Sequence, residues 1–308
     1  MTMSGVIETR IVITGASGQV GSYLIDILRS HDIVGLDMRP PKIDAHKRCV
    51  HLVDVRFSMD EFFRGCDAVV HSAAQVSVAY SIKNPKFDAE NNVVATVNVL
   101  ECARKNDARV IFLSSAAVYG EPEYVPIDEE HPKNPKSPYG ISKLTGERYV
   151  QLYQELYGLK CAIVRPFNIY SPRARFGQGE GGVIYRFVER AIKGSTLHIF
   201  GDGKQTRDFI HAKDVARMIT LILQKDLYSV FNCGSGVEVS LNTLAYLIRD
   251  EIKSNLGREV DIQYLPPREG EIVRSCADMS RAREVLGFST KISLLEGISE
   301  LINELSKK

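Results

Sequence analysis

The fold is decided by the stretch RIVITGASGQVG, residues 10–21. A β-branched run ends there in Gly15, Gly18 and Gly21, and apolar residues then recur at helical spacing as far as Leu28. This order predicts a strand, a tight glycine turn and a helix whose first amides can hold a pyrophosphate. A glycine triplet alone is a weak signal, so its meaning depends on the residues after it.

A second strand, residues 33–36, follows the helix and ends in Asp37. An acidic side chain there accepts hydrogen bonds from the ribose hydroxyls of an adenosine and repels a 2′-phosphate, so we expect NAD rather than NADP. Arg39 leaves NADP open, because a nearby arginine can bind the 2′-phosphate. After the next strand, Asp54 and Val55 are placed to flank an adenine with a carboxylate and an apolar wall.

Strands and helices alternate regularly up to about residue 168, which predicts an α/β fold with a Rossmann-like, doubly wound parallel sheet. A helix at 91–103 should turn Val94, Val97 and Leu100 toward its core. After a loop at 171–182 the pattern changes, and short strands mixed with helices predict a smaller mixed α/β lobe. The expected strands are 10–14, 33–36, 50–53, 67–71, 109–113, 159–165, 197–200, 230–232 and 262–265, and the expected helices after residue 168 are 183–193, 215–223, 241–252, 280–286 and 294–305.

The chain therefore divides into two expected parts with a ligand cleft between them. We expect a cofactor-binding domain at residues 1–168 together with about 206–232. The substrate-binding lobe should comprise residues 169–205 and 233–308.

Chemistry is expected in the segment SPYGISK, residues 137–143. Ser137 can cap a helix and Pro138 suits its first turn. Tyr139 and Lys143 are then four residues apart on one helical face, where the lysine charge would stabilise a tyrosinate and lower the pKa of the phenol. The alternative is a surface tyrosine and a solvated lysine on an ordinary helix.

Composition narrows the choice of partners and compartment. Lys and Arg number 39 and Asp and Glu 38, a net charge of +1, which does not favour nucleic acid or an anionic membrane. The sequence has no apolar run long enough for a membrane span and no signal core, so we expect a cytoplasmic protein. Its six cysteines are scattered without a CxxC pair, which favours reduced thiols over disulfides and gives no metal site.

Together these features resemble the extended short-chain dehydrogenase/reductase family, and within it the nucleotide-sugar 4-epimerases of the UDP-galactose 4-epimerase type. The resemblance runs nearly end to end and implies NAD in the first lobe and a UDP-sugar under the second. The matching residues are Gly15, Gly18 and Gly21; Asp37; Asp54 and Val55; His71, Ser72, Ala73 and Ala74; Asn92; Ser114 to Gly120; Tyr139 and Lys143; Arg165 to Asn168; Arg207 to His211; and Arg268, Glu269, Gly270 and Glu271.

The resemblance also implies the catalytic roles. Tyr139 would take the proton from the sugar 4-hydroxyl, Lys143 would hold the nicotinamide ribose, and Ser115 would hydrogen-bond the same sugar oxygen. Hydride would move from carbon 4 to NAD and return to the other face of a 4-keto sugar that has turned over. The implied cofactor-binding residues are Gly15, Gly18, Gln19, Val20, Gly21, Asp37, Asp54, Val55, Ser72, Ala73, Ala74, Asn92, Ser114, Tyr139, Lys143 and Phe167.

For the substrate, the resemblance implies that Arg207 and Arg268 contact the diphosphate and that Asn168 contacts a phosphate or the sugar. Two arginine forks match the charge and geometry of phosphate oxygens. The alternative is that either arginine only pairs with a neighbour, Asp208 or Glu271. The full implied substrate-binding set is Ser115, Asn168, Val183, Phe200, Arg207, Arg268, Glu271 and Ser275.

The type of reaction can be narrowed at two positions. Dehydratases of this family place an acid and a base directly after the hydroxyl residue, where this chain has Ala116 and Ala117, which argues against a 4,6-dehydratase. A reductase, a decarboxylase, a UDP-glucuronate 4-epimerase or a non-catalytic NAD sensor stays open.

Two further expectations come from the resemblance. Ser275 matches a gate beside carbon 2 of the sugar, and its small size should admit UDP-N-acetylglucosamine and UDP-N-acetylgalactosamine as well as UDP-glucose and UDP-galactose. A shift of one residue would put Cys276 there, which is also small. A homodimer is expected through helices near 92–104 and 139–157, although their apolar stripes could equally be core: Val93, Val97, Tyr149, Val150 and Tyr153.

Overall fold

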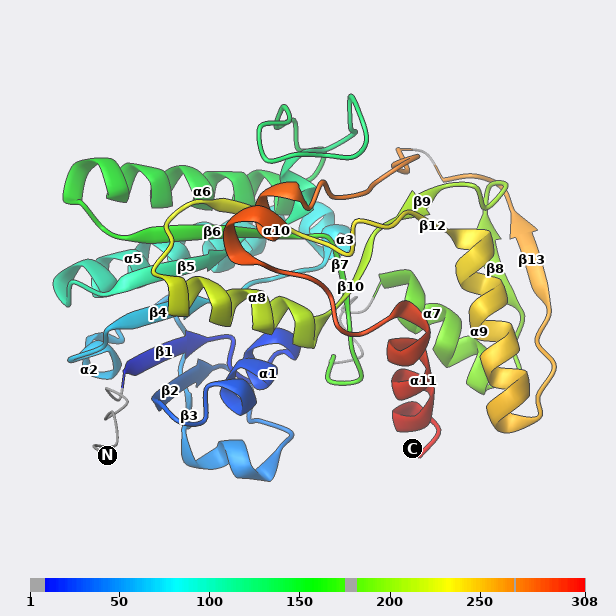
Figure 1. Cartoon of the computed structure of the whole chain (residues 1–308), viewed down its shortest axis with the longest axis horizontal. Coiled ribbons are helices and arrows are strands. Elements are labelled where there is room, and N and C mark those ends of the chain that lie inside the picture. Colours follow the sequence, from blue (N-terminus) through cyan, green and yellow to red (C-terminus); the bar gives the residue numbers. More distant parts are fainter. Residues whose placement is uncertain (1–8, 175–181, 269, 308) are drawn as a thin grey trace.

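A computed structural model of the chain describes residues 9–174, 182–268 and 270–307. Its larger part is built on a seven-stranded sheet in the order β11-β6-β5-β4-β1-β2-β3, with every neighbouring pair parallel (Figure 1). The predicted Rossmann-like, doubly wound fold is confirmed. The strands are β1 (Arg10–Thr14), β2 (Asp32–Asp37), β3 (Val50–Leu52), β4 (Ala68–His71), β5 (Arg109–Leu113), β6 (Cys161–Pro166) and β11 (Val230–Cys233).

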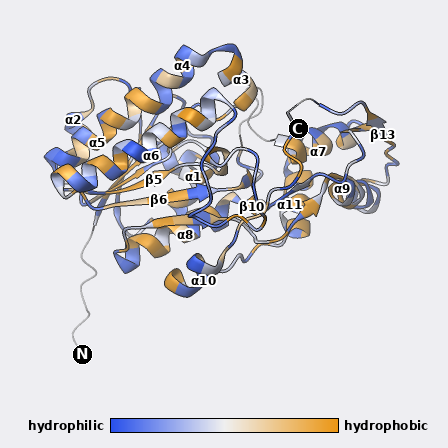
Figure 2. Cartoon of the chain, turned by 90° about the horizontal axis from the view of Figure 1, so that it is seen from above, coloured by the Kyte–Doolittle hydropathy of each residue, from blue (hydrophilic) through white to orange (hydrophobic). Residues whose placement is uncertain are grey.

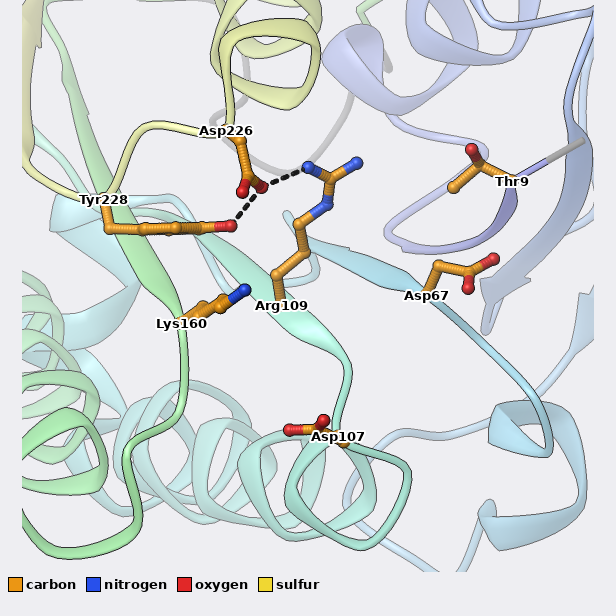
Figure 3. Close-up of a pocket in the computed structure, with 7 residues that line it drawn as sticks. All are labelled: Thr9, Asp67, Asp107, Arg109, Lys160, Asp226 and Tyr228. Atoms are coloured by element: carbon orange, nitrogen blue, oxygen red, sulfur yellow. Dashed lines mark hydrogen bonds and ion pairs between the residues drawn. The ribbon is translucent and has the colours of Figure 1, made fainter. Parts of the chain in front are cut away.

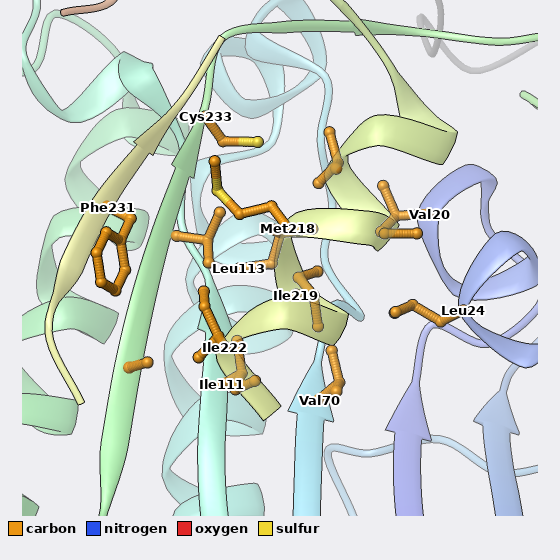
Figure 4. Close-up of a cluster of buried hydrophobic side chains, with 14 of the residues drawn as sticks. Val20, Leu24, Val70, Ile111, Leu113, Met218, Ile219, Ile222, Phe231 and Cys233 are labelled. Atoms are coloured by element: carbon orange, nitrogen blue, oxygen red, sulfur yellow. The ribbon is translucent and has the colours of Figure 1, made fainter. Parts of the chain in front are cut away.

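Helices cover both faces of this sheet, and a hydrophobic cluster lies under each layer. Viewed from above, the largely hydrophobic strands β5 and β6 lie between α5 and α6 on one side and α8 on the other (Figure 2). Figure 4 shows Met218, Ile219 and Ile222 of α8 lying over strand residues such as Ile111 and Leu113. The covering helices are α1 (Gln19–Ile27), α8 (Ala212–Lys225) and α10 (Ser280–Leu286) on the first face, and α2 (Asp60–Phe63), α5 (Ala95–Lys105) and α6 (Pro138–Tyr157) on the second.

The sheet also fixes where a ligand can bind. From β1 the chain continues outward to β2 and β3 on one side and to β4, β5 and β6 on the other, so the strand order reverses between β1 and β4. Open parallel sheets bind ligands in the crevice at the carboxyl ends of the strands beside such a reversal. The glycine turn, Asp37 and the residues after His71 all come to this edge.

The helix predicted at 91–103 differs from the expectation. A π-helical turn, η2 (Glu90–Val94), precedes α5, and Val94 is 48% exposed while Leu100 is buried. The prediction that Val94 faces the core is therefore wrong, because it assumed a regular spacing of about 3.6 residues per turn. The wider turn instead places the polar residues Asn91 and Asn92 inside.

A smaller lobe follows the sheet, with α7 (Gly182–Ile192), α9 (Leu241–Leu256) and α11 (Leu294–Leu305) around a third hydrophobic cluster. Its strands β8 (Leu197–Phe200) and β13 (Ile262–Leu265) pair in parallel. Helix α10 does not join this cluster but packs on strand β11 of the sheet and on helix α8.

The predicted division of the chain into two domains stays a prediction. The described residues contain no helix long and apolar enough to cross a membrane. The remaining short elements are η1 (Asp44–Arg48), α3 (Val78–Lys83), α4 (Pro85–Ala89), η3 (Ala116–Val118), β7 (Asn168–Tyr170), β9 (Thr206–Arg207), β10 (Phe209–His211) and β12 (Val239–Ser240), and residues 175–181 of the expected loop lie outside the described ranges.

A buried ion pair joins the sheet to α6. Arg165 on β6 donates from Nε and Nη2 to the two carboxylate oxygens of Glu147 at 2.9 and 2.8 Å, and each side chain is 1% exposed. The Ser114 hydroxyl donates to Glu147 at 2.5 Å, and the Tyr119 hydroxyl accepts from Arg165 at 2.9 Å. These contacts fix α6 against the carboxyl ends of β5 and β6, where the site is expected.

Replacing one partner of this pair should destabilise the protein strongly. We expect Glu147→Ala to lower the free energy of unfolding by about 3–5 kcal/mol, because Arg165 would keep an uncompensated buried charge. The matched control is Glu189→Ala, which breaks an exposed pair with Lys193 and should cost less than about 1 kcal/mol. Urea denaturation followed by circular dichroism measures the free energy of unfolding of both variants. Equal losses of stability in the two variants would contradict the stabilising role of the buried pair.

Candidate active site

The glycine turn brings β1, α1 and the end of β4 together. Gly15 has φ +70°, and a Cβ there would lie 2.7 Å from the backbone nitrogen of Ala73. A Cβ on Gly21 would lie 2.3 Å from the carbonyl oxygen of Gly15. Both positions therefore need glycine for close packing of the backbone.

The same turn is tied to Asp37 at the end of β2. The two carboxylate oxygens of Asp37 accept hydrogen bonds from the backbone amides of Ser17 at 2.9 Å and Arg39 at 2.8 Å. A carboxylate oxygen has more than one acceptor site, so Asp37 can still receive ribose hydroxyls. It thus positions the turn while remaining available to an adenosine.

These residues fit a dinucleotide. The N-cap of α1 is Gly18, which makes no side-chain cap, and the first turn holds no acidic residue, so its amides suit an anion. Ser72, Ala73 and Ala74 leave only small side chains at the end of β4, the Ser72 hydroxyl donating to the carbonyl of Thr14 at 2.6 Å. At the predicted adenine position Val55 is buried, and Asp54 pairs with Arg56 at 2.6 Å.

Helix α6 begins as the sequence predicts, and it buries both of the predicted catalytic residues on it. Ser137 is the N-cap and accepts a hydrogen bond from the amide of Gly140 at 3.1 Å. Tyr139 is 8% exposed and Lys143 3%, so the alternative of a surface tyrosine and a solvated lysine is wrong. Ser115, two residues after the end of β5, lies close enough to act on the Tyr139 side chain, and Lys143 is one turn further along the helix that carries Tyr139.

The electrostatics of this group differ from the prediction. Burial raises the pKa of Tyr139 to about 12; the hydrogen bond from Ser115 acts to lower it and the charge of Asp88 to raise it. Burial lowers the pKa of Lys143 to about 8, against the charges of Asp88 and Glu147. Lys143 donates to the carbonyl of Leu113 at 2.8 Å. The expectation that the lysine would leave Tyr139 with a lowered pKa is wrong for the protein's own residues, because desolvation dominates.

Asn92 is the centre of a buried polar network that sequence reasoning missed. Its side-chain nitrogen, which has two N–H groups, lies within hydrogen-bond distance of three acceptors: Asp88 at 3.1 Å, Ser142 at 3.1 Å and the carbonyl of Gln75 at 3.0 Å. Its oxygen accepts from the amide of Gln75 at 2.8 Å. The signal was present, because Asp88 and Asn92 lie four residues apart and so share one helical face. The binding of NAD by Asn92 stays a prediction.

The side chains of two other predicted cofactor-binding residues make contacts inside the protein. The hydroxyl of Ser114 is bound to Glu147, and Phe167 is 6% exposed within the hydrophobic cluster of the sheet. Both lie directly after the carboxyl ends of strands, β5 and β6, as the prediction required.

A second hollow lies in the smaller lobe and contains three of the predicted substrate residues. This cavity of about 1070 Å³ is lined by Phe200, Arg268, Glu271 and neighbours from segments 200–205, 264–268 and 271–274. The guanidinium of Arg268 lies 3.7 Å from the ring centroid of Phe200. Arg186 of α7, an unpredicted residue, lies close enough to Arg268 for the two charges to repel: burial and Arg268 lower the pKa of Arg186.

Arg207 reaches the edge of this cavity. It pairs with Glu271 at 3.5 Å and donates to the carbonyl of Ile272 at 2.8 Å, so the pairing alternative holds for Glu271. Asp208 instead accepts from the Ser235 amide at 2.7 Å. Three other predicted substrate residues do not line the cavity: Asn168 is exposed on β7, Val183 is half-buried on α7 and Ser275 is half-buried beside Cys276. Glu269, which the resemblance includes without a binding role, lies outside the described residues.

A smaller cavity of about 290 Å³ lies at the opposite edge of the sheet (Figure 3). Asp67, Arg109 and Lys160 border it at or beside the amino ends of β4, β5 and β6, and Arg109 pairs there with Asp226 at 2.6 Å. It contains none of the predicted residues. Ligands of this fold bind at the carboxyl ends of the strands, so we do not place the reaction here.

Comparisons with known proteins agree with this geometry. The family model described as "NAD dependent epimerase/dehydratase family" matches residues 11–234. The UDP-glucose 4-epimerase of Mycolicibacterium smegmatis is 36% identical, covering 97% of this chain and 99% of that protein. The crystal structure of the Thermotoga maritima UDP-glucose 4-epimerase with UDP-glucose has a TM-score of 0.88 at 32% identity, covering 97% of this chain and 99% of that one.

A second similar structure contains a modified sugar. It is the UDP-N-acetylglucosamine 4-epimerase of Methanobrevibacter ruminantium M1 in complex with UDP-N-acetylmuramic acid, with a TM-score of 0.89 at 29% identity, covering 97% of this chain and 98% of that one. The family match extends over the glycine turn, Asp37, Ser115, Tyr139 and Lys143. The chain therefore belongs to the NAD dependent epimerase/dehydratase family.

Proposed function

We propose that this protein is an NAD-dependent isomerase that epimerises carbon 4 of a UDP-hexose. The observation that carries the proposal is the burial of Tyr139 and Lys143 on one helix, with half-buried Ser115 acting on Tyr139, in a domain whose glycine turn fits a dinucleotide. Relatives that match from end to end and are named UDP-sugar 4-epimerases support it. The six cysteines are unpaired, which fits a reducing compartment, and we place the enzyme in the cytoplasm.

In the proposed reaction Tyr139 removes the proton of the sugar 4-hydroxyl while Ser115 holds the same oxygen. Bound NAD supplies reversible hydride acceptance at carbon 4 and a positive ring charge that favours the tyrosinate. The Lys143 ammonium adds a second positive charge on the same helical face. Because burial raises the pKa of Tyr139 to about 12, the phenol is protonated at neutral pH until positive charge arrives beside it.

The smaller lobe would hold the nucleotide while the sugar turns over. Arg207 and Arg268 supply two guanidinium groups at or beside the large cavity, and Phe200 lines it. A diphosphate held by such forks stays in place while the 4-keto sugar rotates about its link. Ala116 begins the turn η3 directly after Ser115, so no carboxylate stands there for a dehydration.

Incubating the protein with NAD and each UDP-sugar, and resolving the products, tests this function. We expect interconversion of UDP-hexose 4-epimers without net NADH. Net NADH formation or consumption would instead indicate a reductase, and carbon dioxide released from UDP-glucuronate a decarboxylase. No conversion of any UDP-sugar would refute the proposal.

Tyr139→Phe should reduce kcat by about 10³-fold, within the range that a positioned acid–base group contributes, because the phenol oxygen that moves the proton is lost. NAD binding should persist. Tyr157→Phe is the matched control, since Tyr157 is 53% exposed on the same helix and should keep full activity. A Tyr139→Phe enzyme with kcat near that of the control would disprove the role of Tyr139.

Ser275→Tyr should close the site to N-acetylated sugars if Ser275 is the proposed gate. We expect turnover of the UDP-N-acetylglucosamine and UDP-N-acetylgalactosamine pair to fall by about tenfold or more, while the UDP-glucose and UDP-galactose pair changes little. The ratio of the two rates in one enzyme preparation is the measurement. An unchanged ratio would remove the gate.

We further propose a homodimer through α5 and α6. Ile141, Leu152 and Leu156 form an exposed apolar stripe on α6, at 55%, 42% and 62% exposure, and Val94 adds to it from η2. Of the residues predicted for this contact, Tyr149 is exposed and Val93 and Val97 are half-buried, but Val150 and Tyr153 are buried core. Paired helices of this kind form an isologous, two-fold contact.

Leu156→Lys should weaken this dimer by a factor of about 10 or more, because an ammonium would be placed in an apolar contact. Leu295→Lys is the control, since Leu295 is exposed on the distant helix α11. Sedimentation equilibrium over a range of concentrations gives the two dissociation constants. A wild-type monomer, or equal behaviour of the variants, would rule out this interface.

A further inference from the structure

Asp88 is a buried carboxylate that is not paired with a lysine or arginine among the described residues. It lies on α4 and is 1% exposed. Its Oδ1 atom accepts from Gln75 at 2.7 Å and from Asn92 at 3.1 Å, whereas its buried Oδ2 atom has no hydrogen-bond partner among the described residues. Buried carboxylates are costly unless they are paired, so this one requires an explanation.

Hydrogen bonds connect Asp88 to α6, the helix that carries Tyr139 and Lys143. Asn92 joins Asp88 to Ser142, and the Ser142 hydroxyl donates to the carbonyl of Tyr139 at 3.0 Å. The amide of Tyr139 donates in turn to Ser81 of α3 at 3.2 Å. The π-helical turn η2 packs against both α4 and α6, and this places Asn92 between them. Asp88 thus holds the backbone of the first turn of α6.

The charge of Asp88 also reaches the reacting groups. Among the described residues, the charges that act on Lys143 are those of Asp88 on α4 and Glu147 on α6, and Lys143 in turn acts on His71 of β4. Burial, followed by the charge of Lys143, lowers the pKa of His71 to about 3, so its ring is neutral. Glu147 is already paired with Arg165. Asp88 is therefore the carboxylate in this set that has no cation of its own.

We propose that Asp88 is a positioning residue of the reaction, which fixes the start of α6 through Asn92 and Ser142 and adds a buried negative charge to the surroundings of Tyr139 and Lys143. The proposal rests on the proposed function. It implies a compromise, because the same charge opposes the tyrosinate form of Tyr139. Asp88 would therefore set the pH range in which a charged lysine and an ionisable phenol coexist.

The test compares Asp88→Asn and Asp88→Ser with Glu90→Gln. Glu90 is a control on the next turn, a half-exposed carboxylate near Arg56 and Lys86 at 3.8 and 3.9 Å. Loss of the Asp88 charge should lower the pKa of both Lys143 and Tyr139. Both limbs of the kcat–pH profile should then move to lower pH by about 1 unit in the two Asp88 variants, with little movement in the control.

A second measurement does not need turnover. Tyrosinate absorbance of the NAD complex is titrated in each variant, with Tyr139→Phe in the same background as the blank, and the Tyr139 step should move to lower pH. A kcat that falls equally at every pH with an unmoved tyrosinate step would reduce Asp88 to a structural role and overturn the proposal. If no UDP-sugar reacts but the step moves, the proposed function fails while Asp88 keeps its assignment.

Discussion

The ammonium of Lys143 and the phenol of Tyr139 are both buried on α6, and the surrounding structure has to compensate for their loss of contact with water. Removing Lys143 from water disfavours its charge, and the protein offsets this with the Leu113 carbonyl, the face of Phe112 at 5.0 Å and the negative charges of Asp88 and Glu147. Glu147 in turn needs Arg165. The site thus extends into the sheet as a chain of compensated charges, and α6 cannot move without disturbing it.

Much of the fold could be predicted from local sequence signals. The strands of the central sheet and the helices α10 and α11 agree with the expected ranges, because alternating runs and glycine turns are recognised within a few residues. The π-helical turn at Glu90–Val94 was missed because it departs from the regular helical period. The packing of α10 on the sheet depends on contacts between distant segments, which no local pattern contains.

The site was predictable in its residues and less so in its electrostatics. Tyr139 and Lys143 are both buried on α6 and Ser115 acts on Tyr139, but the pKa values of Tyr139 and Lys143 depend on desolvation, and sequence spacing does not measure burial. The sequence left open whether Arg207 contacts the diphosphate or only pairs with a neighbouring carboxylate. In the structure Arg207 pairs with Glu271, whose carboxylate would compete with a diphosphate for the same guanidinium. An anion arriving there would have to displace a carboxylate, which favours a ligand with more than one negative charge.

The wide turn η2 has a consequence for how the protein can change. Removing Glu90 or Asn91 would turn the π-helical segment into regular α-helix, which is locally the more stable backbone, yet it would rotate Asn92 by roughly 100° relative to Asp88 and so break their hydrogen bond. In this segment the regular helical geometry and the hydrogen bonds of Asn92 exclude each other. Its length is thus held by activity rather than by folding, and insertions or deletions are better tolerated in almost any surface loop.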